Sequence, residues 1–152
     1  MHGGSNEKYL VCGLDDENYS DATYRLCDTT DEAVEVAKAN VTDCLGLDYD
    51  PEVTIGNDHG KLRVEYKEDT CFYVNVIIEI DVNDGDFIGI LHHAYDGVDF
   101  FVKVAGSREE CLAKLKEECK ALADVSYQEY TDQIIADDGI NWWVGDIYKF
   151  KK

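Results

Sequence analysis

The sequence has no apolar run that approaches the roughly 20 residues needed to span a bilayer. Its first six residues also lack the basic start and the apolar stretch of a secretory signal. Both absences predict a cytoplasmic protein without membrane contact. The six cysteines lie far apart within apolar patterns, which is typical of small buried side chains and not of a disulfide framework.

Recognisable metal and cofactor motifs are missing as well. There is no Cys-x-x-Cys pair, so we expect no zinc site, and no Gly-rich loop leads into an expected helix to hold a phosphate. The acidic run 81–86 is superficially similar to a calcium loop. However, Gly85 is its fifth residue where the sixth must be glycine, and His92 stands where a bidentate glutamate is needed. We predict a turn there, and neither metal nor cofactor.

Signs of catalysis are equally scarce. A nucleophile needs a base beside it and a third group that orients the base, and no such motif surrounds any serine or cysteine. His92 and His93 are adjacent, so on a strand they would point to opposite faces and could not serve one site. We expect one of them to pack inward and the other to face solvent. The prediction is a protein that is not an enzyme, with an enzyme of unrecognised type as an alternative.

Carboxylates are what the sequence has in excess. It holds 33 acidic and 14 basic residues, a formal net charge of -19. Such an excess repels itself and costs stability, so it favours either a high-salt environment or a cationic partner. Lysine supplies 11 of the 14 basic residues, which argues against a halophilic surface. The same charge excludes direct binding to DNA or RNA, because the phosphates would be repelled.

Alternating apolar residues predict strands, most clearly over residues 72–82. Turn signals at 57–60, 83–85 and 96–97 lie beside such alternation and predict hairpins. Two helices are expected, each opening with a capping box, Thr29 with Glu32 and Ser107 with Glu110. The two boxes are 78 residues apart, and the same shift brings the strand around residue 9 onto the strand around residue 87.

The predicted fold is therefore α+β, with two tandem β-β-α-β-β units at residues 7–82 and 86–152. We expect a pseudo-twofold relation, mostly antiparallel sheet, and helices packed on one face. Each unit is small for independent stability, so the two should form one compact domain with a shared core or one continuous sheet. Few identities support the repeat, so generic patterning of two similar units stays open. The segment 125–136 could form a short helix.

The carboxylates gather in expected loops and turns, and these are the candidate partner-binding residues. Adjacent Trp142 and Trp143 should point to opposite faces. By analogy with Val64 we expect Trp142 in the core and Trp143 as an exposed anchor. The full candidate set is Asp15, Asp16, Glu17, Asp21, Asp48, Asp50, Glu52, Glu68, Asp69, Asp81, Asp84, Asp86, Asp137, Asp138 and Trp143.

The net charge of the chain can be compared with that of duplex DNA of the same length. A compact chain of this size is about 40 Å across, and duplex DNA of that length carries about 23 phosphate charges. The leading hypothesis is a non-enzymatic inhibitor that occupies the nucleic-acid-binding groove of a basic enzyme such as a nuclease, as phage anti-restriction and anti-CRISPR proteins do. It requires the carboxylates to gather on one side. The alternatives are an immunity protein that neutralises a basic toxin, and an acidic structural or regulatory protein with no charged partner. The sequence indicates no oligomeric state.

Overall fold

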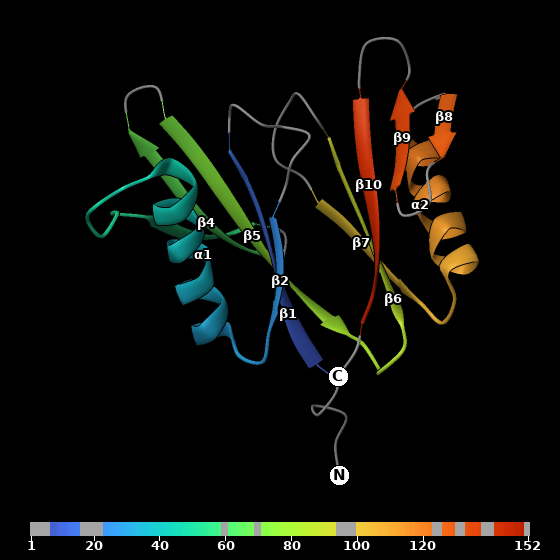
Figure 1. Ribbon diagram of the computed structural model, residues 1–152, viewed down its shortest axis with the longest axis horizontal. Coiled ribbons are helices and arrows are strands. Elements are labelled where there is room, and N and C mark those ends of the chain that lie inside the picture. The colour runs from blue at the N-terminus through green and yellow to red at the C-terminus, as the bar shows by residue number, and fades with distance from the viewer. Residues whose placement is uncertain are drawn as a thin grey trace. The chain divides into compact units, whose positions relative to one another are not determined.

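Two five-stranded antiparallel sheets, each with one helix, make up the part of the chain that the computed structural model describes. The described residues are 7–15, 23–58, 61–68, 71–93, 100–122, 126–129, 133–137 and 142–150. The chain divides into two units, Met1–Asp81 (unit 1) and Val82–Lys152 (unit 2), which are described separately (Figure 1). The α+β class and the antiparallel sheet predicted from the sequence are confirmed.

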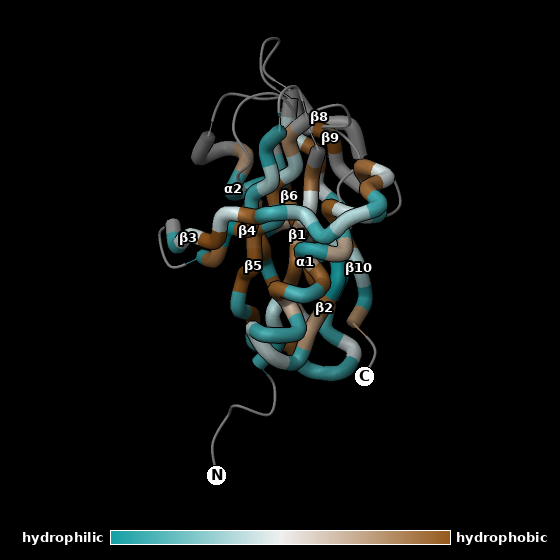
Figure 2. The backbone as a smooth tube through the Cα atoms, turned by 90° about the vertical axis from the view of Figure 1, so that its left-hand side faces the viewer, coloured by the Kyte–Doolittle hydropathy of each residue, from teal (hydrophilic) through white to brown (hydrophobic). Residues whose placement is uncertain are grey.

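Unit 1 forms its sheet in the order β2-β1-β5-β4-β3. Its elements are β1 (Glu7–Asp15), β2 (Thr23–Cys27), α1 (Thr30–Leu45), β3 (Thr54–Asp58), β4 (Lys61–Glu68) and β5 (Cys71–Asp81). Apolar residues follow one another along β5 (Figure 2), the strand that the alternation predicted most clearly. The predicted hairpin at 57–60 joins β3 to β4, with residues 59 and 60 outside the described part.

Unit 2 repeats this strand order, as β7-β6-β10-β9-β8. Its elements are β6 (Phe87–His93), β7 (Phe100–Ala105), α2 (Arg108–Leu122), β8 (Ser126–Glu129), β9 (Gln133–Asp137) and β10 (Trp142–Lys149). The register repeats as well: Tyr9 pairs with Cys27 in unit 1, and 78 residues later Phe87 pairs with Ala105 in unit 2.

Three of the predicted details are wrong. Each helix is followed by three strands, where two were predicted, because the additional strands β3 and β8 are short and largely polar. Of the segment 125–136, residues 126–129 form β8 and residues 133–136 belong to β9, so these described residues are strands and not a helix. The turn at 83–85 joins strands of different sheets and is not a hairpin, since β5 and β6 are not paired. The turn signal at 96–97 lies outside the described residues.

Helix α1 begins and ends as its sequence predicts. The Thr29 hydroxyl accepts a hydrogen bond from the Glu32 amide at 3.1 Å, and the Glu32 carboxylate accepts one from the Asp28 amide at 3.3 Å. The helix ends at Gly46, whose φ of 66° is the left-handed conformation that glycine adopts without a steric penalty. Its buried side, which includes Ala33 and Ala37, packs on the central strands of unit 1.

Helix α2 is capped in the same way, with the Glu110 amide donating to the Ser107 hydroxyl at 3.2 Å. It lies close to its sheet: a Cβ atom added to Gly89 would come within 2.7 Å of the Cys111 sulfur. Trp143 is 5% exposed and belongs to the core beneath α2, with Cys111 and Leu115. The predicted role of Trp143 as an exposed anchor is therefore wrong, because register places its ring under the helix.

Two further expectations concern single side chains. His92 is fully buried, and its ring is tilted by 43° against that of Phe100 at a centroid distance of 5.7 Å, which confirms that one histidine of the pair packs inward. Cys44 is exposed, contrary to the expectation for all cysteines, because it lies near the end of α1, where it donates to the Tyr73 phenol oxygen at 3.5 Å. Among the described helices, neither is long and apolar enough to cross a membrane.

Candidate partner-binding surface

The negative charge is divided unequally between the two units. The sequence of unit 1 holds 19 acidic and 6 basic residues, a net charge of -13, whereas unit 2 holds 14 and 8, a net charge of -6. The two units are of similar length, so unit 1 carries about twice the net charge of its counterpart. A cationic partner would therefore meet the stronger field at unit 1.

Within unit 1 the charge concentrates on α1 and on the connection that follows it. Residues 28–52, here called the acidic α1 segment, contain eight carboxylates and one basic residue, Lys38. The buried positions of the helix are occupied by alanine and valine, which leaves the charged residues on its outer side. All eight carboxylates are exposed: Asp28, Asp31, Glu32, Glu35, Asp43, Asp48, Asp50 and Glu52.

This arrangement is not the one that would best stabilise the helix. Carboxylates in the first turn, such as Asp31, interact favourably with the helix dipole. The last turn instead contains Asp43 and no basic residue, where a negative charge is unfavourable by about 0.3–1 kcal/mol. Lys38 contributes one exposed ion pair, with Glu35 at 3.8 Å. Helix stability alone therefore does not account for the charge pattern of α1.

Helix α2 provides an internal comparison, because it occupies the same place in its own unit. It contains four acidic and four basic residues and is formally neutral. Two of its charged side chains contact the neighbouring strand: Glu118 pairs with Lys103 at 3.8 Å, and Lys114 donates to the Val104 carbonyl oxygen at 2.9 Å. A concentrated acidic surface is thus a property of α1 and not of the shared fold.

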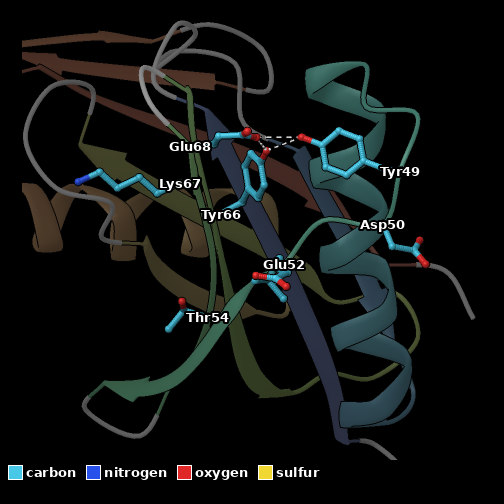
Figure 3. A pocket seen from close by; sticks show the side chains of 8 residues that line it. Tyr49, Asp50, Glu52, Thr54, Tyr66, Lys67 and Glu68 are labelled. Carbon is cyan, nitrogen blue, oxygen red and sulfur yellow. Dashed lines mark hydrogen bonds between the residues drawn. The ribbon is translucent and has the colours of Figure 1, made fainter.

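A pocket of about 670 Å³ lies where the α1–β3 connection meets the end of β4 (Figure 3). Its lining includes three carboxylates and a single cation, Lys67, which points away from the two tyrosines in the view. The residues that line it are Tyr49, Asp50, Glu52, Val53, Thr54, Tyr66, Lys67 and Glu68. The acidic α1 segment therefore ends in a concave site.

Three of these side chains form one hydrogen-bonded group, here called the Tyr–Tyr–Glu triad. The Tyr49 hydroxyl donates to Oε2 of Glu68 at 2.8 Å, and the Tyr66 hydroxyl donates to the same oxygen. The two phenol oxygens are 3.0 Å apart. Tyr66 is buried at 4% exposure, whereas Tyr49 is 49% exposed and presents its ring to solvent.

The triad fixes the charge of Glu68. Hydrogen bonds from Tyr66 and Tyr49 favour the carboxylate and hold the pKa of Glu68 below its usual value. The pKa of the Tyr66 phenol is raised mainly by its hydrogen bond to Glu68 and next by its hydrogen bond with the Tyr49 hydroxyl. Glu68 is consequently an oriented anion at neutral pH, positioned by a buried phenol beneath it.

The buried cysteines are poorly suited to nucleophilic chemistry. Burial raises the pKa of both the Cys111 and the Cys119 thiols to about 11, so neither forms a thiolate in appreciable amount at neutral pH. Within the described residues, no group of three His, Cys, Asp or Glu side chains is arranged to hold a metal ion.

The structure brings together only part of the predicted site. Asp50, Glu52 and Glu68 line one pocket, and Asp48 is exposed in the same connection. Asp81 is exposed at the far end of β5 from the pocket.

Other predicted positions serve a turn or lie beyond the description. Asp84 is exposed, and the Asp86 carboxylate accepts from the Asn83 amide at 2.9 Å, which stabilises the turn. Asp15 and Asp137 belong to β1 and β9, but their side chains are not described. Outside the described residues lie Asp16, Glu17, Asp21, Asp69 and Asp138.

Sequence reasoning missed the two tyrosines of the triad. Tyr66 and Glu68 are two residues apart on one strand, so alternation alone places them on the same side of β4. Tyr49 stands between Asp48 and Asp50 in a segment already singled out for its charge.

Comparison of the chain with protein-family models, with curated proteins and with solved structures finds no match.

Proposed function

We propose that this protein is a non-enzymatic inhibitor that binds in the nucleic-acid groove of a basic enzyme, with the acidic α1 segment in the place of backbone phosphates. The observation that carries the proposal is the contrast between the helices: α1 carries four exposed carboxylates and one lysine, and four more exposed carboxylates flank it within residues 28–52, whereas the four carboxylates of α2 are balanced by four basic residues. A charge pattern that one copy of a fold has and the other lacks calls for an explanation outside the fold itself.

The number of charges along the helix can be compared with that of a phosphate backbone. A helix of 16 residues is about 24 Å long. One DNA strand carries a phosphate every roughly 3.4 Å, or about seven over that length. The helix itself carries four carboxylates over that length, and the four that flank it within residues 28–52 bring the acidic α1 segment to eight. Such a surface would attract a basic groove from a distance, and its binding would weaken steeply with salt.

We further propose that the two units are tandem copies related by a pseudo-twofold. Their common strand order and the constant 78-residue shift between the first two strands of each unit support this relation. On this view, the acidic surface belongs to one copy, and the partner contacts unit 1. Unit 2 then serves as a natural internal control for every charge substitution in unit 1.

The test uses two triple variants that remove equal charge. Asp31→Asn/Glu35→Gln/Asp43→Asn neutralises part of the acidic α1 segment without touching the pocket, and Glu109→Gln/Glu117→Gln/Glu118→Gln does the same on α2. Proteins from the cells that make this chain are captured on it at low salt and eluted with duplex DNA, and the eluted enzyme is purified. Displacement of a labelled duplex from that enzyme is then measured for the wild type and both variants, at low and high salt.

We expect the α1 variant to compete about 3- to 100-fold less well, since each of three exposed ion pairs contributes about 0.2–1 kcal/mol. The α2 variant should stay close to the wild type. Equal losses in both variants would show that only net charge matters. Failure of duplex DNA to elute the captured enzyme would reject mimicry, and a captured toxin whose inhibition is unrelated to its nucleic-acid groove would favour the immunity role.

A further inference from the structure

The pocket at the end of β4 has features that the acidic α1 segment lacks, namely a concave shape, an exposed aromatic ring and an oriented carboxylate. We infer that this pocket is a guanidinium site, which receives an arginine side chain of the partner or a small guanidino compound. The inference rests on the proposed function for the identity of the protein partner. The chemistry of the pocket can nevertheless be tested without that partner.

Glu68 is the centre of the site. Both phenols donate to its Oε2, which leaves Oε1 as the oxygen that the two tyrosines do not use. Because the carboxylate is already held in place, a cation can bind it without first ordering a flexible side chain. Glu52 and Asp50 also line the pocket; in the view, the Tyr66 ring lies between Glu52 and Glu68, and the Asp50 carboxylate points away from the triad (Figure 3).

The exposed ring of Tyr49 selects among cations. A guanidinium is planar, presents paired N–H donors to a carboxylate and stacks on aromatic faces, whereas an ammonium is a compact and strongly hydrated charge. Tyr49 is 49% exposed, and its hydroxyl is tied to Glu68, so its ring is held beside the carboxylate. A cation–π contact and an ion pair are therefore available to one ligand at once.

The size and electrostatics of the pocket also suit such a ligand. Its volume of about 670 Å³ falls within the range of ligand pockets, about 300–1,000 Å³. Three carboxylates against one lysine give its lining a net charge of -2, and that lysine points away from the triad (Figure 3). The pocket therefore attracts a cation and leaves room for the stem of a long side chain.

The experiment titrates the full chain with tetra-arginine and with tetra-lysine, which carry equal charge, and follows backbone amide shifts by NMR. We expect the arginine peptide to bind at least about 5-fold more tightly, with the largest shifts at residues 49–54 and 66–68. Glu68→Gln and Tyr49→Ala should each weaken arginine binding about 10-fold. Tyr49→Phe, which keeps the ring, should lose less. The matched control is Glu79→Gln, an exposed glutamate on β5 outside the pocket, and should bind as the wild type does.

Equal affinity for the two peptides, or shifts spread along the acidic α1 segment and unaffected by Glu68→Gln, would overturn the inference and leave mimicry untouched. Conversely, a failed duplex displacement would reject mimicry without changing the arginine titration. Argininamide distinguishes the source of the ligand. If it binds as tightly as the peptide does, the site takes a small guanidino compound, and if it binds much more weakly, the site takes a protein side chain.

Discussion

Units 1 and 2 fill the same helix–sheet contact differently: in unit 1 the larger side chain comes from the strand, and in unit 2 it comes from the helix. In unit 1 the strand supplies Val11 and the helix supplies Ala37, and both belong to one core cluster. The corresponding residues of unit 2, 78 positions later, are Gly89 on the strand and Leu115 on the helix, and a Cβ atom added to Gly89 would lie 3.1 Å from Leu115. The shared register thus fixes which positions meet, while the volume at each contact is set by the pair of residues together.

Unit 1 also contains a polar cluster beneath α1. Asn75 is fully buried, donates to the Ala37 carbonyl oxygen at 3.1 Å and accepts from Asn40 at 3.0 Å. In unit 1, Asn75 on β5 pairs with Gly13 on β1. The counterpart of Gly13 in unit 2 is Leu91, which pairs with Gly145 on β10. The position equivalent to Asn75 is therefore a glycine, which has no side chain. Unit 1 therefore depends on hydrogen bonds where unit 2 depends on apolar contact.

Exchanging the two packing solutions should give the largest effect. Leu115→Ala is expected to lower the free energy of unfolding by about 2–5 kcal/mol, because it leaves a cavity under α2. Gly89→Val alone should cost about 1–3 kcal/mol through overpacking. A Cβ atom at Gly89 would also lie 2.7 Å from the Cys111 sulfur, so the variant that reproduces the unit 1 packing adds Cys111→Ala, the counterpart of Ala33, to both changes. This combined variant should be markedly more stable than the sum of the single costs implies. Denaturant unfolding, with amide exchange of β6 as a local probe, measures the coupling, and strictly additive costs would show that the two contacts are not equivalent.

Removing the polar cluster should have a smaller effect, confined to unit 1. Asn75→Ala is expected to cost about 1–3 kcal/mol, since it leaves the amide of Asn40 without its acceptor. Glu79→Gln, on the same strand but exposed, should change stability by less than about 0.5 kcal/mol. Amide exchange in β1 and β5 should respond to the first substitution, while β6 and β10 stay unchanged. If Asn75→Ala were as stable as the wild type, the polar cluster would be dispensable in unit 1, just as unit 2 folds with Gly145 at the equivalent position.

The triad should give the smallest effect, visible mainly in titrations. The pKa of Glu68 is lowered in the folded state, so its contribution to stability is present above its unfolded pKa and is lost as pH falls through its folded pKa. Tyr66 has a raised pKa, so its contribution is present below its ordinary value of about 10 and is lost at higher pH. Alkaline absorbance titration of the wild type and Tyr66→Phe isolates this phenol, and Glu68→Gln should return its pKa toward the ordinary value. Ionisation of Tyr66 unaffected by Glu68→Gln would contradict the triad.

Much of the fold could be predicted because burial leaves a periodic trace in the sequence. Strand β5 has an apolar residue at every second position from Phe72 to Ile80, although residues 73–77 are all buried, and the first turn of each helix is marked by a capping box. Strand β3 could not be recognised as an element of its own, because residues 54–57 are all exposed and show no alternation between faces. Trp143 was misassigned for a related reason: Val64 on β4 was matched to Trp142 on β10, 78 residues later, whereas the Trp142 side chain itself lies outside the described part. In the structure β10 pairs with β6, the first strand of unit 2, just as β5 pairs with β1, the first strand of unit 1. The counterpart of β10 is therefore β5 and not β4.

The candidate site was only partly predictable, because its members come from separate elements. Charge counting found Asp50, Glu52 and Glu68 as acidic residues. It could not show that a loop after α1 folds back onto the end of β4, nor that Tyr49 and Tyr66 meet there at 3.0 Å. Such contacts depend on the path of the chain between elements, which carries no periodic signal.

In each unit the first and the last strand are neighbours at the centre of the sheet, running in opposite directions. Glu7 therefore stands opposite Asp81, and Phe87 stands opposite Lys149. The first and the last strand residues of each unit are therefore next to each other in the sheet. A module of this kind can be inserted into, appended to or excised from a longer polypeptide at a single junction without breaking a strand pairing.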